Sequence, residues 1–200
     1  MDIQTIRNTI RTQRKNLSPT QVQSISQKIS EKIIQLPEFL QSQHIAYYIS
    51  HENEIDPASI IQQAKKLNKS LYLPVISQKN KLDFYLINVD TKFIKNKFNI
   101  SEPLIKNQKP VRPENLNLIL APLVAFDENC NRLGRGLGCY DLYLQFTKNT
   151  PQNKRPTLIG LAYEFQKVEK LIPKSWDVQM DFIVTEKNIY LSSPRNKSDN

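Results

Sequence analysis

Glycine, cysteine, histidine and tryptophan are all scarce in this chain of 200 residues, and long apolar runs are missing. The two cysteines, Cys130 and Cys139, give neither a disulfide framework nor the spacing of a zinc site, so we expect reduced thiols in the cytoplasm. The longest apolar run, 118–126, is far too short to span a bilayer, and the first residues lack the apolar core of a secretion signal. We therefore expect no membrane partner.

The net charge has two interpretations. A formal charge of +9 suits a nucleic-acid partner and equally suits a polyanionic small substrate. The basic residues are spread along the chain, and the tyrosines fall in predicted strands and helices rather than between the basic residues. We favour a solvated basic surface and no nucleic-acid partner, and we keep a basic nucleic-acid-binding module as the alternative.

Three of the four glycines are concentrated in residues 134–138, the glycine segment, where Gly134, Gly136 and Gly138 stand at alternate positions. Arg132 and Arg135 add positive charge to it. A buried strand is predicted before this segment and a helix after it, and that order can build an anion site from free amide groups and the helix dipole. A tight structural turn is the other interpretation, because the spacing matches neither a Walker loop nor the dinucleotide fingerprint. We favour a bound phosphate.

Strands alternate with helices along the chain, which predicts one three-layer α/β domain with a mostly parallel sheet and helices on both faces. The domain is expected over 1–191, followed by a polar, disordered tail at 192–200, and the lack of an apolar surface stripe favours a monomer. Residues 93–109 read as an irregular loop. Helices are predicted over 2–16, 18–36, 56–67 and 140–146, and strands over 45–49, 71–76, 82–87, 118–121, 157–162, 182–185 and 188–191.

Two further features outside the glycine segment concern charge. Arg7, Arg11 and Arg14 share one face of the first predicted helix, and such a row usually means a solvated face, although Arg7 and Arg11 could also reach one anion together. Glu54 follows the first predicted strand, at the end where ligands bind in open α/β sheets. The other interpretation of Glu54 is an exposed loop acid.

Several separated motifs resemble, in order, the 5-formyltetrahydrofolate cyclo-ligase family, whose members are also called 5,10-methenyltetrahydrofolate synthetases. The motif in and around the glycine segment consists of Ala125-Phe126-Asp127, Arg132-Leu133-Gly134-Arg135-Gly136, Gly138, Tyr140 and Asp141. The others are Arg7 with Arg11, Glu54-Ile55, and the segments 98–103, 159–164 and 176–181. Cys130 and Cys139 stand where glycine and tyrosine are common, and Arg7 where lysine is common. The resemblance covers nearly the full length.

This resemblance implies an ATP- and Mg²⁺-dependent enzyme. Members of the family transfer the γ-phosphoryl group of ATP to the formyl oxygen of 5-formyltetrahydrofolate. The neighbouring folate nitrogen then displaces the phosphate, which gives 5,10-methenyltetrahydrofolate, ADP and phosphate. Phosphoryl transfer needs positioning and charge neutralisation more than a protein nucleophile, so the lack of a Ser-His or Cys-His arrangement is no objection.

The resemblance also implies roles for individual residues. ATP would be bound by Arg7, Arg11, Arg132, Leu133, Gly134, Arg135, Gly136, Leu137, Gly138, Cys139 and Tyr140. Catalysis would involve Arg135, which would neutralise charge in the transition state, and Tyr140. Magnesium would be bound by Asp141 and Asp181, and folate would be contacted by Ile49, Glu54 and Phe98. A non-catalytic folate or nucleotide binder is a further alternative, which would be expected to have lost one of the two metal acids.

Overall fold

A seven-stranded sheet forms the centre of the computed structural model, which describes residues 2–76 and 81–192. The strands lie in the order β11-β10-β9-β6-β1-β2-β3. They are β1 (His44–Ala46), β2 (Ser70–Ile76), β3 (Leu82–Ile87), β6 (Leu118–Pro122), β9 (Thr157–Leu161), β10 (Phe182–Val184) and β11 (Ile189–Leu191). Only the edge pairs β2–β3 and β10–β11 are antiparallel. The predicted mostly parallel sheet is therefore confirmed.

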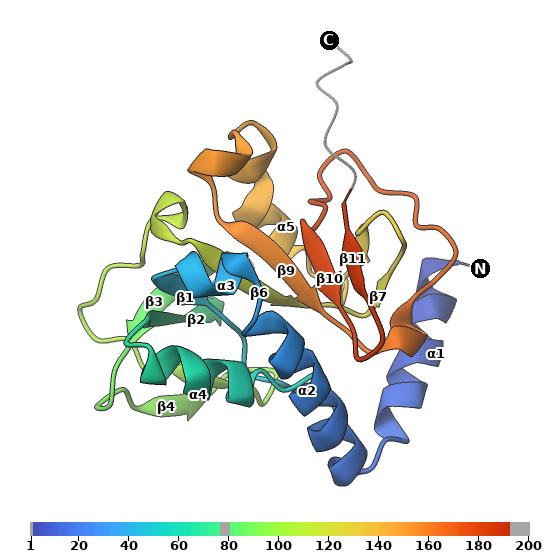
Figure 1. The fold of residues 1–200 in the computed structure, drawn as a ribbon, viewed down its shortest axis with the longest axis horizontal. Coiled ribbons are helices and arrows are strands. Elements are labelled where there is room, and N and C mark those ends of the chain that lie inside the picture. The colour runs from blue at the N-terminus through green and yellow to red at the C-terminus, as the bar shows by residue number, and fades with distance from the viewer. Residues whose placement is uncertain (1, 77–80, 193–200) are drawn as a thin grey trace.

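Helices cover both faces of this sheet, as the sequence predicts (Figure 1). They are α1 (Ile3–Lys15), α2 (Pro19–Ile33), α3 (Pro37–Gln41), α4 (Ala58–Lys66) and α5 (Cys139–Leu144). Neighbouring residues of a strand point to opposite faces. Ile45 and Leu118 accordingly pack in the cluster that includes α2, α3 and α4, whereas Ala46 and Ile119 pack in the cluster that includes α5. The three-layer arrangement follows from this alternation.

The starts of the first two helices are fixed by local sequence. The Asp2 carboxylate accepts hydrogen bonds from the amides of Gln4 and Thr5. Ser18 and Gln21 form a reciprocal capping box, and Pro19 occupies the first turn of α2. These caps satisfy amide groups that a helix start otherwise leaves without partners.

Two short hairpins interrupt segments that the sequence presents as loops. The first, β4 (Phe93–Lys95) with β5 (Ser101–Pro103), lies inside the stretch expected to be irregular. The second, β7 (Ala125–Phe126) with β8 (Arg132–Leu133), stands between β6 and the glycine segment. Helix α1 packs on this second hairpin through an apolar cluster that includes Ile6, Ile10 and Leu133. The first helix is thereby placed beside the glycines.

Other differences from the predicted boundaries are small. Strand β1 ends three residues before the predicted end at Ile49, and α5 ends at Leu144 and continues as a 3₁₀ turn over Gln145–Lys148. Further 3₁₀ turns lie at Pro113–Asn115, Gln152–Lys154 and Glu164–Gln166. Of the tail predicted at 192–200, only Ser192 belongs to the described residues, and its amide donates to the Asp181 carbonyl.

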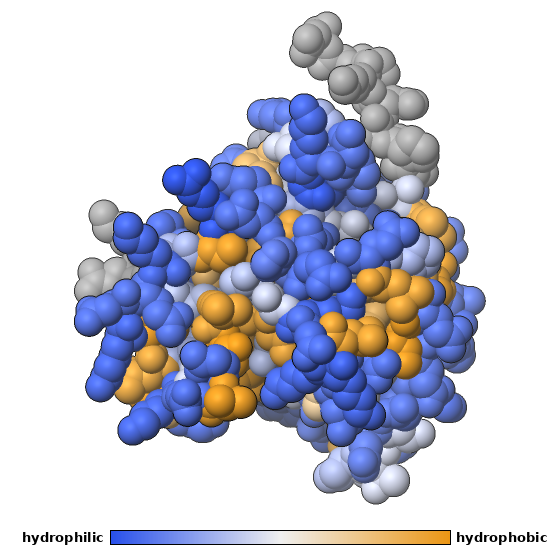
Figure 2. Space-filling view, turned by 60° about the vertical axis from the view of Figure 1, so that its left-hand side comes forward, coloured by the Kyte–Doolittle hydropathy of each residue, from blue (hydrophilic) through white to orange (hydrophobic). Residues whose placement is uncertain are grey.

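The face drawn in Figure 2 is mainly polar. On this face, apolar residues gather in separate patches within a hydrophilic surface. Within the described ranges, no helix is long and apolar enough to cross a membrane.

Candidate active site

The loops that follow β1 and β6 meet at one edge of the sheet. These two strands are parallel neighbours, and the chain continues from β1 to β2 on one side while β6 pairs with β9 on the other. Ligands bind outside the carboxyl ends of strands at such a reversal of strand order. Glu54 lies in the loop after β1, and the glycine segment follows β6 through the β7–β8 hairpin. The fold thus brings the two features together.

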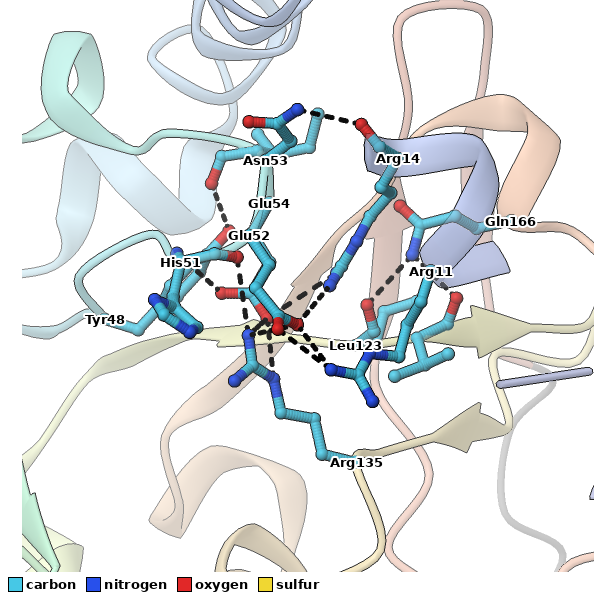
Figure 3. Close-up of polar contacts among 12 residues, drawn as sticks. Arg11, Arg14, Tyr48, His51, Glu52, Asn53, Glu54, Leu123, Arg135 and Gln166 are labelled. Atoms are coloured by element: carbon cyan, nitrogen blue, oxygen red, sulfur yellow. Dashed lines mark hydrogen bonds and ion pairs between the residues drawn. The ribbon is translucent and has the colours of Figure 1, made fainter. Parts of the chain in front are cut away.

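An ion pair joins these two loops. The Nε and Nη2 atoms of Arg135 donate to Oε1 of Glu54 at 3.2 and 2.9 Å. Glu54 is buried, so the interpretation as an exposed loop acid is wrong. Figure 3 shows the guanidinium groups of Arg11 and Arg14 from one helix, and that of Arg135 from the glycine segment, converging on Glu52 and Glu54.

Helix α1 contributes the other two arginines of this cluster in very different ways. Arg11 is half-exposed and donates to both carboxylate oxygens of Glu52 at 2.9 and 3.1 Å. Arg14 has only 1% of its side chain exposed, and its guanidinium lies 3.6 Å from Glu54 and 3.8 Å from Glu52. Among the described residues, none of the three guanidinium nitrogens of Arg14 has a hydrogen-bond partner. The expected solvated face of α1 is therefore wrong at Arg14.

The charges of this cluster affect one another. Burial lowers the pKa of Arg14, and Glu54 opposes that shift. Burial would raise the pKa of Glu52, but the hydrogen bond and charge of Arg11 outweigh it, so that the pKa of Glu52 is lowered. Glu52 is thus held as a carboxylate at neutral pH.

A small, mostly apolar cavity of about 150 Å³ opens beside Glu54. Its apolar wall includes Tyr48, Ile49, Leu73, Ile76, Leu82, Ile100, Leu123 and Leu137. Its polar lining includes Glu54 with Arg135, the Asn96–Glu102 pair of the β4–β5 hairpin, Arg132 with Asp141, and Tyr140. A flat, largely apolar ligand with a few hydrogen-bonding groups fits such a lining. We call it the apolar cavity.

A larger cavity of about 670 Å³ lies on the other side of the glycine segment. Its wall carries five cationic side chains: Arg7, Arg132, Lys148, Lys170 and Lys174. It also carries three aspartates and the tryptophan, namely Asp2, Asp141, Asp177 and Trp176. Gly134, Gly138, Arg132 and Asp141 line both cavities, so the glycine segment forms the wall between them. We call the larger one the basic cavity.

The glycines let an arginine approach the main chain. Gly136 has φ +106°, a conformation that side chains with a Cβ rarely adopt. The Arg7 guanidinium lies 3.5 Å from the place where a Cβ of Gly136 would stand, and Arg7 Nε donates to the Gly134 carbonyl at 3.0 Å. Helix α1 and the glycine segment are joined through this contact.

The buried Arg132 pairs with the partly exposed Asp141 at the boundary of the two cavities, with Nη2 and Oδ1 2.7 Å apart. The same Asp141 oxygen accepts from the Val178 amide at 3.1 Å. Burial lowers the pKa of Arg132 and Asp141 opposes this, while burial raises the pKa of Tyr140, whose ring lies against the Arg132 guanidinium. Within the described part of the chain, Arg132 Nε and the Tyr140 hydroxyl are buried without hydrogen-bond partners. Both groups can donate to a bound ligand.

Comparison with known proteins decides the family. The family model described as the 5-formyltetrahydrofolate cyclo-ligase family matches residues 2–186. The chain belongs to this family. The 5-formyltetrahydrofolate cyclo-ligase of Haemophilus influenzae is 38% identical over 88% of this chain and 94% of that protein. The Escherichia coli protein of the same name is 30% identical over 90% and 98% of the two chains.

Solved structures agree with this assignment. The NMR structure of 5,10-methenyltetrahydrofolate synthetase from Aquifex aeolicus has a TM-score of 0.80 and 30% identity, and the match covers 100% of this chain and 97% of that one. The synthetase from Mycoplasma pneumoniae has a TM-score of 0.72 and 26% identity, over 93% and 99%. The chain is thus an enzyme of the ligase class with the family's α/β fold.

The structure brings most of the expected nucleotide and folate residues of this ligase to the two cavities. Arg7 and Gly136 line the basic cavity, and Ile49, Glu54, Leu137, Cys139 and Tyr140 line the apolar one. Leu133 packs with α1 in the apolar cluster and lines the basic cavity. Arg135 lines the apolar cavity only, because it turns toward Glu54.

Three of the expected residues lie elsewhere. Phe98 and Arg11 line neither cavity: Phe98 lies in the β4–β5 hairpin, and Arg11 pairs with Glu52. Asp181 is bound bidentately by Arg155 at 2.6 and 2.8 Å and also accepts from the Leu158 amide at 2.9 Å. It lines neither cavity, so the geometry does not support a metal role for it.

Sequence reasoning missed residues that the structure places at the cavities. Asp177, four positions before Asp181 in the same motif, lines the basic cavity with Asp141. Asn96 and Glu102 line the apolar cavity, whereas Phe98, two residues after Asn96, does not. Arg14 lines neither cavity, but it is buried beside Glu54. Asp177 and Glu102 lie within the motifs and Asn96 lies next to one, but motif spacing does not say which residue of a motif faces a ligand.

Proposed function

We propose that this enzyme converts 5-formyltetrahydrofolate to 5,10-methenyltetrahydrofolate in a reaction that consumes ATP and requires Mg²⁺. The observation that carries the proposal is the glycine segment, which forms the common wall of a basic and an apolar cavity. Joining two reactants requires their reacting groups to meet at such a boundary. A triphosphate on the basic side and a folate on the apolar side would meet there.

The basic cavity suits the triphosphate. Arg7 and Arg132 reach it from α1 and from β8, and lysines surround it. Arg132 is buried and keeps one nitrogen without a partner, so it can donate to a phosphate oxygen without losing a bond. Arg11, which is engaged by Glu52 outside this cavity, is left out of the proposed ATP site.

Asp141 and Asp177 are the carboxylates that we assign to Mg²⁺. Magnesium usually takes one or two carboxylates together with phosphate oxygens and water, so two acids on the wall of the basic cavity are sufficient. The described residues contain no group of three or more acids, histidines or cysteines that could hold a metal by themselves, which fits a metal bound together with the nucleotide. When bound, the ion would neutralise charge on the phosphates.

The apolar cavity suits the folate ring. Ile49 and the apolar wall would contact its faces, and Glu54 would accept hydrogen bonds from ring N–H groups. The Tyr140 hydroxyl, kept protonated by burial, would donate to the substrate. A folate that binds Glu54 competes with Arg135 for the same carboxylate, and this would free the Arg135 guanidinium to neutralise charge on the transferred phosphoryl group.

The reaction would then proceed in two steps. The formyl oxygen takes the γ-phosphoryl group and ADP leaves. The neighbouring folate nitrogen attacks the formyl carbon and loses its proton, the bond from that carbon to the phosphorylated oxygen breaks, and phosphate leaves. The chain supplies positioning and positive charge for both steps, and no side chain needs to act as a nucleophile.

The test follows the absorbance of the methenyl product in a mixture of protein, 5-formyltetrahydrofolate, ATP and Mg²⁺. Parallel mixtures omit ATP or Mg²⁺, and ADP is measured in the same samples. We expect product and ADP in equal amounts, and neither without nucleotide or metal. Product formed without ATP would contradict the proposed reaction, and ATP binding without any product would favour a non-catalytic binder.

A further inference from the structure

The segment 171–178 forms one wall of the basic cavity and carries an exposed tryptophan. Trp176 is the single tryptophan of the chain, and 55% of it is exposed although it is the largest apolar side chain type. Large aromatic side chains that remain exposed on a cavity wall are typical of binding sites. The proposed phosphate-binding groups of the cavity leave Trp176 without a role.

Local bonds hold Trp176 in a defined place. The Lys174 amide donates to the Asp177 carboxylate at 2.8 Å, and the Asp177 amide donates back to the Lys174 carbonyl at 3.0 Å. The Lys174 ammonium lies 5.2 Å from the Trp176 ring centroid. The Val178 amide binds Asp141, which ties the segment to the wall that separates the cavities.

The chemistry of the cavity defines what could lie on this ring. The cationic side chains account for phosphates, but a nucleotide also carries a flat, largely apolar base. Bases stack on aromatic side chains, and every base offers a π-face for that contact. An ammonium group such as that of Lys174 is also attracted to the face of an aromatic ring that it lies against.

We propose that Trp176 is the platform on which the nucleobase of the triphosphate stacks. This inference rests on the proposed binding of ATP in the basic cavity. It adds that the base contributes to binding separately from the phosphates. Trp176 would therefore favour binding of a nucleoside triphosphate over inorganic polyphosphate. Because stacking tolerates different bases, it would discriminate little among purines.

The test compares two ligands, ATP and inorganic tripolyphosphate, each with Mg²⁺ in isothermal titration calorimetry. The variants are Trp176→Ala and Trp176→Phe, and Phe93→Ala serves as a control because Phe93 is an exposed aromatic residue that lines neither cavity. We expect Trp176→Ala to weaken ATP binding about tenfold or more, since stacking is lost, while tripolyphosphate binding changes less than about twofold. Trp176→Phe should restore most of the ATP affinity, and Phe93→Ala should bind both ligands as the unaltered protein does.

The unaltered protein gives a second readout. Its tryptophan emission, excited where tyrosine does not absorb, comes from Trp176 alone, so ATP should quench this emission more strongly than tripolyphosphate does. Equal weakening of both ligands in Trp176→Ala, or unchanged ATP affinity, would overturn the inference while leaving the proposed ATP site intact. If the unaltered protein binds neither ligand, the ATP site and the base platform fail together.

Discussion

Two arginine–aspartate pairs in this molecule look alike at close range and differ in their surroundings. Arg132 and Asp141 lie 2.7 Å apart, and Arg155 and Asp181 lie 2.6 Å apart. The first pair borders both cavities at the carboxyl edge of the sheet. The second binds the Leu158 amide near the start of β9, at the opposite end of the strands.

The two pairs also differ in how completely their hydrogen-bonding groups are used. Both oxygens of Asp181 accept from Arg155, in the bidentate geometry that gives the strongest carboxylate–guanidinium pairs. In the first pair a single Asp141 oxygen accepts from both Arg132 and the Val178 amide, and Arg132 keeps a nitrogen without a partner among the described residues. The first pair therefore retains capacity for a ligand, whereas the second is already satisfied.

Replacing Asp141 by asparagine is expected to have the largest effect. The substitution keeps the size of the side chain and its ability to accept from the Val178 amide, but removes the charge assigned to Mg²⁺. We expect kcat to fall about a hundredfold or more, because the developing phosphate charge loses a positioned counter-ion. Product absorbance at several Mg²⁺ concentrations measures this, with the melting temperature as a control for folding.

Asp177→Asn provides the matched variant for that experiment. We expect it to raise the Mg²⁺ concentration needed for half-maximal activity, because Asp177 lines the basic cavity with Asp141. An Asp141→Asn enzyme with normal kcat and normal Mg²⁺ dependence would remove Asp141 from the proposed metal site.

Asp181→Ala is expected to affect stability instead of metal dependence. Loss of one partner leaves Arg155 as an uncompensated charge, and breaking a buried pair in this way costs about 3–5 kcal/mol. Urea unfolding of the variant measures that loss. The Mg²⁺ dependence of the folded fraction should match the unaltered enzyme, and a shift in it would show that Asp181 does contact the metal.

Much of the fold could be predicted because its signals are local and repeated. The apolar strand at 118–121 and the capped starts at Asp2 and Ser18 each specify their own element. The short β4–β5 and β7–β8 hairpins were missed, because strands of two or three residues are too short to give a periodic pattern.

The site could be predicted only in part, because motifs fix neighbourhoods rather than orientations. The motif 176–181 contains two aspartates, and nothing in its spacing says that Asp181 turns to Arg155 while Asp177 lines a cavity. The burial of Arg14 depends on packing of α1 against a loop some forty positions away, as its distance to Glu54 shows. Such contacts exist only in the folded chain.

Arg14 is a third buried arginine, and among the described residues none of its guanidinium nitrogens has a hydrogen-bond partner. Arg14→Met keeps most of the volume and removes a desolvated charge, so we expect little loss of stability. Glu54 would lose a neighbouring positive charge and would be held less firmly for the folate ring. We therefore expect the KM for 5-formyltetrahydrofolate to rise about three- to tenfold, as a charge-assisted contact worth ~1 kcal/mol is lost, while kcat changes less.

Arg11→Ala is the matched control on the same helix face. Arg11 pairs with Glu52 at a half-exposed position, where an ion pair contributes less than about 1 kcal/mol, and it lines neither cavity. Its KM for folate should stay within about twofold of the unaltered value, which corresponds to less than ~0.5 kcal/mol. Steady-state kinetics on both variants measures these KM values. Arg14→Lys keeps a positive charge and should partly restore the KM of Arg14→Met, which separates the effect of burial from the effect of charge. Equal increases in KM for the two variants would mean that α1 acts through its overall positive charge and that the burial of Arg14 beside Glu54 has no specific role.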